Sequence, residues 1–247
     1  MWDDPRSLNA ASAALAALAV ALLVFAVLEL LIRSSFFPLR ELTIEGKLEN
    51  ITRIELEDAA RPRLNGNFFA VRPSDVRAGL EGLAWVRRAD VRRVWPDRLA
   101  VALEEHKALA HWGDDALVNT HGERFIGRSD ALLPLFAGPA GTERLVTERY
   151  RVFARALAPL GADVRQLVLT PRYAWQIRLS NGLEIVLGRE GARDRVEARL
   201  ARFVESYPST LGRITGKHAY VDLRYPNGYA LRVPGVDREA RKSAVRS

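Results

Sequence analysis

Cysteine is absent from the 247-residue chain, so no disulfide, thiol nucleophile or cysteine metal ligand is available. Histidine is scarce as well. His106, His111, His121 and His218 are too scattered to suggest a metal site, and we expect them to be surface or packed imidazoles. The sequence therefore predicts no metal, no cofactor and no catalytic residue.

Motifs for catalysis are missing too. Ser206 and Ser209 have neither a nucleophile-elbow sequence around them nor a local base. Residues 188–191, Gly-Arg-Glu-Gly, precede a predicted helix but lack the glycine spacing and the lysine of a phosphate-binding loop. We expect a helix entry turn there. These absences argue against an enzyme. A membrane-anchored periplasmic enzyme such as a cell-wall hydrolase nevertheless remains an alternative function.

Composition indicates a folded chain with acidic partners. The sequence is 48% hydrophobic and 27% charged, which allows real cores and argues against disorder. A net charge of +7 favours anionic lipid head groups or acidic protein segments as partners. Nucleic acid fits poorly, because no aromatic-basic motif of the RNA-binding kind is present.

One long stretch without charge stands near the N-terminus. Residues 7–28 span about 33 Å as a helix, which matches a hydrocarbon core of about 30 Å. A cleaved signal peptide is the rival interpretation, but the residues that follow do not form a small-residue cleavage site. We therefore expect an uncleaved transmembrane helix over residues 8–32. The flanking charges do not settle its orientation.

The next segment alternates short strands and helices. Residues 39–44 predict a strand, and Thr52 with Glu55 forms a capping-box pattern at the start of a helix. Ser74 is expected to cap a second helix with Val76 and Leu80 on one face. Residues 86–94 and 99–103 then predict two strands. The order is β-α-α-β-β.

Basic and aromatic residues mark the predicted strand pair. Arg87, Arg88, Arg92 and Arg93 suggest either a solvated strand face or contact with anionic lipid or an acidic partner strand. Trp95, like Trp112 and Trp175 further along the chain, is expected to anchor a core or a turn.

From Trp112 onward the pattern is rich in strands. Residues 117–125 predict a hairpin turning at His121-Gly122. Thr142 is expected to cap a helix with Leu145, Phe153 and Leu157 buried. Residues 164–169 predict a strand, and a hairpin around Asn181-Gly182 and an amphipathic helix over residues 194–207 follow.

The segment VDLRYPNGYALRV, residues 221–233, carries the most specific signal. Asn227-Gly228 between apolar runs favours a hairpin turn, because both residues tolerate positive φ. Little chain follows, so we expect residues 229–233 to be a sheet edge with unpaired amides and carbonyls.

With the membrane segment, this hairpin resembles the bacterial cell-division family FtsQ, called DivIB in Gram-positives. The LRYPNG stretch, the Asn-Gly hairpin leading to Leu187-Gly188-Arg189 and the helix ending at residues 202–208 carry the resemblance, and the β-α-α-β-β segment resembles its POTRA module.

The resemblance implies a mixed α/β (α+β) fold: an N-terminal transmembrane helix, a POTRA-like β-α-α-β-β domain and a C-terminal antiparallel-sheet β domain with helices. The corresponding segments are a cytoplasmic tail at 1–7, the transmembrane helix at 8–32, the POTRA-like domain at 34–106, the β domain at 107–236 and a disordered basic tail at 237–247.

The resemblance also implies a function. It is that of a non-enzymatic divisome scaffold in the cell inner membrane, periplasmic beyond its anchor and enriched at the division septum. Such a scaffold recruits the protein partners FtsB and FtsL, meets other divisome proteins through the POTRA-like domain, and helps control septal peptidoglycan synthesis at midcell. A POTRA-bearing secretion component is a further alternative, but it would normally have a β-barrel or several POTRA copies, whereas this sequence offers one candidate copy and no long series of alternating membrane strands.

Partner contact is expected mainly with FtsB. In the family, two arginines that align with Arg172 and Arg224 meet an acidic residue of FtsB, while the hairpin edge takes up its strand. The expected partner-binding residues are Arg172, Arg224, Tyr225, Asn227, Gly228, Tyr229, Leu231 and Val233.

Overall fold

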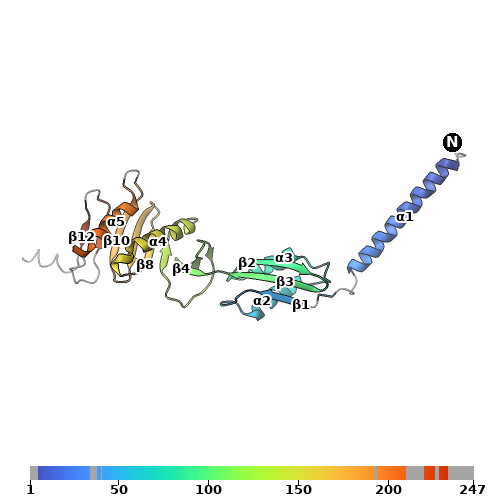
Figure 1. Ribbon diagram of the computed structural model, residues 1–247, viewed down its shortest axis with the longest axis horizontal. Helices are drawn as coiled ribbons and strands as arrows, with labels where there is room; N and C mark the ends of the chain where they lie inside the picture. The colour runs from blue at the N-terminus through green and yellow to red at the C-terminus, as the bar shows by residue number, and fades with distance from the viewer. Residues whose placement is uncertain are drawn as a thin grey trace, which may run out of the picture. The chain divides into compact units, whose positions relative to one another are not determined.

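A computed structural model describes residues 5–33, 38–39, 41–191, 194–209, 220–225 and 228–232. The chain divides into two compact units, Met1–Glu105 and His106–Ser247 (Figure 1). The first contains α1 (Pro5–Arg33), β1 (Glu41–Glu45), α2 (Arg53–Ala60), a 3₁₀ turn (Arg61–Arg63), α3 (Pro73–Glu81), β2 (Val86–Val94) and β3 (Arg98–Glu105). The second contains β4 (Ala108–Trp112), β5 (Ala116–Asn119), β6 (Arg124–Phe125), β7 (Leu135–Ala137), α4 (Glu143–Leu157), β8 (Val164–Leu169), β9 (Ala174–Leu179), β10 (Glu184–Arg189), α5 (Val196–Ser206), β11 (Tyr220–Asp222) and β12 (Ala230–Arg232), with 3₁₀ turns at Ala158–Leu160 and Tyr207–Ser209.

Helix α1 meets the requirements of a membrane span. Its segment Asn9–Val27 has a mean hydropathy of 2.6, and none of that segment is buried within the protein. Apolar side chains such as Leu15 and Leu23 are about two-thirds exposed. A helix that is apolar all round and unburied suits a lipid environment, so α1 agrees with the expected N-terminal anchor.

The rest of the first unit is a small sheet covered by two helices. Its strand order is β1-β3-β2, with β1 parallel and β2 antiparallel to β3. Leu56 of α2 and Leu80 of α3 are buried against Val91 and Val101 of the sheet. The expected β-α-α-β-β order is therefore confirmed, and its core comes from the alternate positions of each strand.

The two helices of this unit begin in different ways. The capping box of α2 is present: the Thr52 side chain accepts from the Glu55 amide, and the Glu55 carboxylate accepts from the Thr52 amide at 2.8 Å. The expected Ser74 cap of α3 is wrong. Arg72 stands at the N-cap without a side-chain hydrogen bond, because Pro73 already begins the helix with its preset φ.

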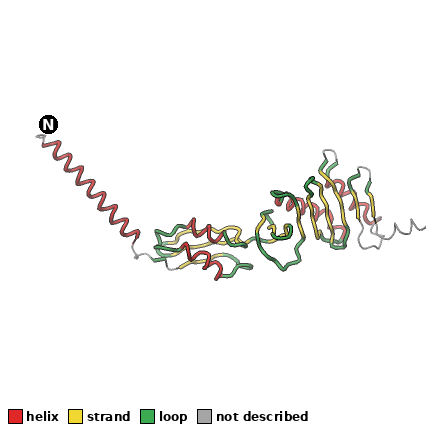
Figure 2. Tube along the Cα trace, turned by 180° about the vertical axis from the view of Figure 1, so that it is seen from behind, coloured by secondary structure: helices red, strands yellow, loops and turns green. Residues whose placement is uncertain are grey.

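The second unit is built on a nine-stranded sheet, ordered β12-β11-β10-β9-β8-β7-β4-β5-β6 among the described residues. Figure 2 shows these strands side by side with the helices packed on the sheet. Phe153 of α4 and Phe203 of α5 are fully buried against Leu167, Ile177 and Ile185. Because residues at alternate positions line this core, the other face of β8 to β10 carries mainly polar side chains, with Val168 and Val186 among them.

This sheet is mixed, whereas the resemblance implied an antiparallel one. The pairs β4/β7, β7/β8 and β10/β11 are parallel. The reason lies in the connections: α4 joins β7 to β8 and α5 joins β10 to β11, and a helical crossover returns the chain to the end from which it started. The expected C-terminal sheet domain with helices is otherwise confirmed.

Helix α4 is shifted by one position from the expected pattern. Leu145, expected inside, is 37% exposed, while the neighbouring Val146 is fully buried with Phe153 and Leu157. Thr142 stands at the N-cap, but its hydroxyl donates to the Pro139 carbonyl at 2.6 Å instead of capping the helix. Spacing alone allowed either neighbour to face the core.

Two of the three expected hairpins have tight turns. The chain turns at His121-Gly122 between β5 and β6 and at Asn181-Gly182 between β9 and β10. In the first, Gly122 has φ +79°, and the buried Asn119 side chain accepts from the amides of His121 and Glu123. The third connection is longer than expected: β11 ends at Asp222 and β12 begins at Ala230, so the strands are not joined by a two-residue turn.

Candidate functional site

The last strand of the sheet, β12, has a partner on one side. It pairs antiparallel with β11, with Leu231 opposite Val221 and Asp222 opposite Ala230. Within the described residues, no strand lies on its outer side. All residues of β12 are exposed, Leu231 at 39%. The expected sheet edge is therefore present at Ala230–Arg232, and such an edge can accept a further strand.

The two faces of β12 differ in character. Directly opposite residues of an antiparallel pair share a face, so Leu231 lies on the helix-covered side with the buried Val221. Tyr229 is on the same side: its ring packs edge-on against Phe203 of α5 at 5.6 Å, and its hydroxyl is 2.9 Å from the Ser206 hydroxyl. This tyrosine anchors the edge to α5 rather than standing clear for a partner.

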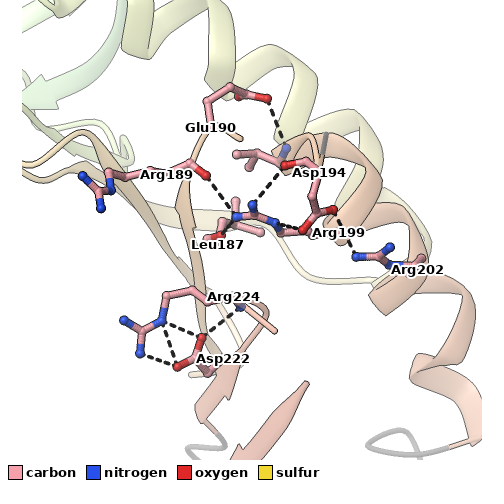
Figure 3. Close-up of polar contacts among 9 residues, drawn as sticks. Leu187, Arg189, Glu190, Asp194, Arg199, Arg202, Asp222 and Arg224 are labelled. Atoms are coloured by element: carbon pink, nitrogen blue, oxygen red, sulfur yellow. Dashed lines mark hydrogen bonds and ion pairs between the residues drawn. The ribbon is translucent and has the colours of Figure 1, made fainter. Parts of the chain in front are cut away.

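Arg224 is held in place by its neighbour Asp222. The Arg224 Nε donates to both carboxylate oxygens of Asp222 at 2.9 and 3.0 Å, and Nη2 donates at 2.6 Å. The Arg224 amide donates to the same carboxylate at 3.0 Å. Asp222 is 5% exposed, whereas the side chain of Arg224 is 59% exposed and turns Nη1 away from Asp222 (Figure 3). The Nε and Nη2 edge of the guanidinium thus binds Asp222, and Nη1 points away from that carboxylate.

Electrostatics match this geometry. The side-chain hydrogen bonds from Arg224 hold the pKa of Asp222 below its ordinary 3.8, with the Arg224 amide and charge adding to the effect and burial opposing it. The same contact raises the pKa of Arg224. The pair is therefore ionised at neutral pH, with a fixed cation beside the sheet edge.

Arg172 lies in the turn between β8 and β9. The turn is closed by the Tyr173 amide donating to the Thr170 carbonyl at 2.8 Å and by the Ala174 amide donating to the Thr170 hydroxyl at 3.0 Å. Tyr173 adopts φ +57°, which is uncommon for a residue other than glycine, and is 55% exposed. Arg172 and Tyr173 are therefore presented together at the tip of a well-bonded turn.

Strand register brings the two arginines to one end of the sheet. Trp175, three positions after Arg172, pairs with Gly188 of β10, and a Cβ at Gly188 would lie 2.8 Å from Cγ of Arg224. Beside Arg224, the face of the sheet that the helices leave open carries a depression of about 290 Å³. Its lining includes Gln166, Gln176, Arg178, Glu184, Tyr220 and Arg224.

The backbone beneath Arg224 is held by a buried guanidinium that sequence reasoning missed. Arg199 of α5 is 9% exposed, and its Nη1 donates to the carbonyls of Leu187 at 2.6 Å and Arg189 at 3.0 Å (Figure 3). Its Nε donates to the Asp194 carboxylate at 2.6 Å. We call Arg199 and Asp194 the α5 clamp. It brackets Gly188, which has φ +78° at a bulge in β10.

A signal for the α5 clamp was present in the sequence. Arg199 lies among Val196, Leu200 and Phe203 on the apolar stripe of the helix. An arginine in that position can be buried only if its guanidinium is paired or hydrogen-bonded. The pKa of Asp194 is lowered mainly by the hydrogen bond from Arg199. What could not be read from the stripe is that the partners are backbone carbonyls on both sides of Gly188.

The remaining expected site residues fall in two groups. Tyr225, 54% exposed, and the exposed Gly228 lie in the connection between β11 and β12. Asn227 and Val233, with Pro226 and residues 237–247, lie outside the described residues.

Comparison with known proteins agrees with both units. Residues 37–106 match the FtsQ-type POTRA domain family, and residues 110–224 match the family described as cell division protein FtsQ/DivIB, C-terminal. The chain is 45% identical to cell division protein FtsQ of Burkholderia pseudomallei, over 96% of each protein. It is 40% identical to FtsQ of Nitrosospira multiformis, over 94% of this chain and 99% of that protein, and 40% identical to FtsQ of Bordetella pertussis, over 94% and 92%.

Proposed function

Because this chain belongs to the FtsQ/DivIB family of cell division proteins, we propose that it acts as a non-enzymatic scaffold of the divisome that recruits FtsB and FtsL. FtsB makes the direct contact, and through it the scaffold helps control septal peptidoglycan synthesis at midcell. The protein is anchored in the inner membrane by α1, with its N-terminus in the cytoplasm and both folded units in the periplasm. It is enriched at the division septum.

The observation that carries this proposal is the outer edge of β12. An extended segment of FtsB adds there as the next strand, so that main-chain hydrogen bonds supply affinity. The exposed side chains of Ala230, Leu231 and Tyr225 give the incoming strand neighbours on both sides of the sheet. An unpaired sheet edge can accept a strand from another chain, and the partner strand occupies this one.

Charge adds selectivity to the strand pairing. Arg224 is held by Asp222 with Nη1 turned outward, and Arg172 stands at the same end of the sheet. A carboxylate of the partner that reaches this end meets a cation whose position is already set. Because the side chain of Arg224 is ordered before binding, less entropy is lost when the ion pair forms.

The test is a titration of FtsB against single variants of the full chain in detergent. Arg172→Glu should weaken binding at least tenfold, because losing a desolvated charge pair costs about 2 to 5 kcal/mol and 1.4 kcal/mol is a factor of ten. Arg224→Gln should have a similar effect. Glutamine is preferred to glutamate at 224, because a second carboxylate beside the buried Asp222 would disturb the strand itself.

The matched control is Arg124→Glu. Arg124 lies on β6, at the opposite edge of the same sheet, and also forms an exposed ion pair, with Asp115 at 3.3 Å. This variant should bind FtsB as the wild type does. Equal affinities for the wild type, Arg172→Glu and Arg224→Gln would remove both arginines from the site.

A further inference from the structure

The hairpin tip between β2 and β3 carries a tryptophan that the fold does not bury. Trp95 is 76% exposed, whereas Trp112 and Trp175 are 7% and 3% exposed in the second unit. The preceding Val94 is also partly exposed, at 37%. A tryptophan placed at a turn to anchor the fold would be covered, so the expected anchoring role is not met at this position.

Phe69 belongs to the same end of the first unit. It is 45% exposed in the loop between α2 and α3. Arg93, two positions before Trp95, donates to the carbonyl oxygens of Phe69 at 3.3 Å and Val71 at 2.7 Å. The loop and the hairpin tip are therefore tied together, and they present two aromatic side chains from one end of the domain.

The chain enters the domain at this same end. Glu41, the first residue of β1, pairs in parallel register with Arg98, the first residue of β3 and the last of the hairpin turn. Pro38 forms an isolated antiparallel bridge with Asn67, two positions before Phe69. Pro38 thus lies beside the Phe69 loop, and Glu41 lies beside the hairpin tip.

Chain length limits how far this end can lie from the anchor. Helix α1 ends at Arg33, five positions before Pro38 and eight before Glu41. At no more than about 3.6 Å per residue, Pro38 lies within about 18 Å of the helix end and Glu41 within about 29 Å. Lys47, just past the opposite end of β1, is separated from the end of α1 by more residues, so chain length limits its distance from the anchor less tightly.

The chemistry of this end suits a lipid surface. Tryptophan favours the head-group level, phenylalanine adds an apolar ring that can enter the interface, and arginine binds phosphate through its planar guanidinium. The acceptors of Arg93 are neutral carbonyls, which do not cancel its charge. Arg98 pairs with Glu41 at 3.3 Å and lies 3.8 Å from Asp97, but its side chain and that of Glu41 are more than half exposed, and such exposed pairs are weak and exchangeable.

We propose that this end of the domain docks on the surface of the anchor's own membrane, with Trp95 and Phe69 at the head-group level and Arg93 and Arg98 on the phosphates of anionic phospholipids. We call these four residues the lipid-facing end. The docking sets the orientation of the first unit on the bilayer. It does not depend on the recruitment of FtsB and FtsL, which involves β12 of the other unit.

The experiment uses the full chain in vesicles of phosphatidylethanolamine and phosphatidylglycerol. Because the chain has no cysteine, one introduced cysteine carries a unique fluorescent label. Ala70→Cys places the label beside Phe69, and Lys47→Cys, at a side chain that is 87% exposed, places it past the other end of β1. A lipid with a quencher in its head group should quench the label at 70 at least about twofold more than the label at 47, because interfacial aromatic residues hold their surroundings at that depth.

Second substitutions in the Ala70→Cys chain separate the contributions. Trp95→Ser and Arg93→Gln should bring quenching down to the level at position 47. Ile54→Ser, which removes another exposed apolar side chain of the same domain at 71% exposure, and Arg88→Gln, which removes an exposed arginine of the same strand, should leave it unchanged. Thermal unfolding followed by circular dichroism verifies that each variant is folded.

Three results would overturn the proposal. The first is equal quenching at positions 70 and 47. The second is strong quenching at 70 that survives both Trp95→Ser and replacement of phosphatidylglycerol by phosphatidylcholine. The third is protection of the label at 70 that requires an added acidic protein, which would make this end a protein-binding surface instead.

Discussion

Arg199 shows what a single charged residue can do inside an apolar stripe. Its guanidinium uses Nε and both terminal nitrogens, reaching the carbonyls of Leu187, Arg189 and Asp194 and the Asp194 carboxylate. These hydrogen bonds offset the cost of burying the cation, whereas its removal leaves several acceptors unpaired. The α5 clamp therefore connects the helix to the strand beneath Arg224.

Arg199→Leu should destabilise the second unit, although leucine matches the apolar stripe. Unpaired buried carbonyls should lower the free energy of unfolding by at least about 2 kcal/mol. Urea unfolding measures this. Arg202→Leu is the matched control, because Arg202 reaches the same Asp194 at 3.3 Å from a side chain that is 54% exposed, and it should change stability little. Equal losses for the two variants would contradict the role assigned to Arg199.

The Asp222–Arg224 pair predicts a pH dependence with a definite sign. The pKa of Asp222 is lower in the folded than in the unfolded protein, so this carboxylate contributes stability that is complete above pH 3.8 and is lost as pH falls through the folded pKa. Asp222→Asn should lack that part of the acid destabilisation. Chemical denaturation at a series of pH values from 7 to about 3 gives the comparison. Asp115→Asn, which alters an exposed pair, should keep the wild-type fall. Parallel curves for the wild type and Asp222→Asn would contradict the assignment.

At the scale of elements, β12 is a weakly stabilised strand, and a partner strand on its outer side would stabilise it. The strand is short, all its residues are exposed, and its inner neighbour β11 is itself short. Tyr229 compensates by packing on Phe203 and Ser206 of α5. Short edge strands resist unwanted pairing. The shortness of β12 therefore limits aggregation, while its unpaired outer side can still bind one specific partner strand.

Leu231→Pro tests the strand rather than a side chain. Proline removes one backbone donor and disturbs the ladder, so FtsB affinity should fall at least tenfold, which corresponds to about 1.4 kcal/mol. Because Leu231 is 39% exposed, the core of the unit should survive, and circular dichroism can verify that. Leu231→Val keeps the backbone donor and an apolar side chain that suits a strand, and should bind as the wild type does. Retained affinity in the proline variant would place the docking edge elsewhere.

At the scale of the whole molecule, we expect the anchor to be separable from partner recognition. Each folded unit has its own buried core, and the core of the second includes residues from Ala110 to Leu223. The boundary between the two units lies between Glu105 and His106. Trp112, in β4, and residues 113–115, in the β4–β5 connection, therefore belong to the second unit. The apolar requirements of one unit are therefore met without the other.

Replacing residues 10–32 with an unrelated transmembrane span should leave FtsB capture intact. The anchor has no Gly-x-x-x-Gly pair that would specify a helix partner. Co-purification of FtsB with the swapped chain and with the wild type makes the comparison, and truncation before Val221 is the negative control. Loss of capture after the swap would show that the anchor itself recognises the partner.

Local sequence signals determined much of this protein. The charge-free stretch, the capping box at Thr52, the glycine turns at 122 and 182 and the alternation of strand residues each depend on neighbours within a few positions, and the structure confirms them. Where two neighbours were equally apolar, as at Leu145 and Val146, or where Pro73 competed with Ser74, local pattern could not decide.

Tertiary structure alone decided the relations between distant segments. The parallel pairs of the second sheet, the approach of Gly188 to Arg224, the α5 clamp and the place of β12 at the edge all join residues far apart in sequence. So does the pairing of Glu41 with Arg98, which brings Trp95 to the end of the domain at which β1 begins. The physical reason is that hydrogen-bond register and burial of charge depend on which elements meet, and that is settled by packing of the whole unit rather than by any one segment.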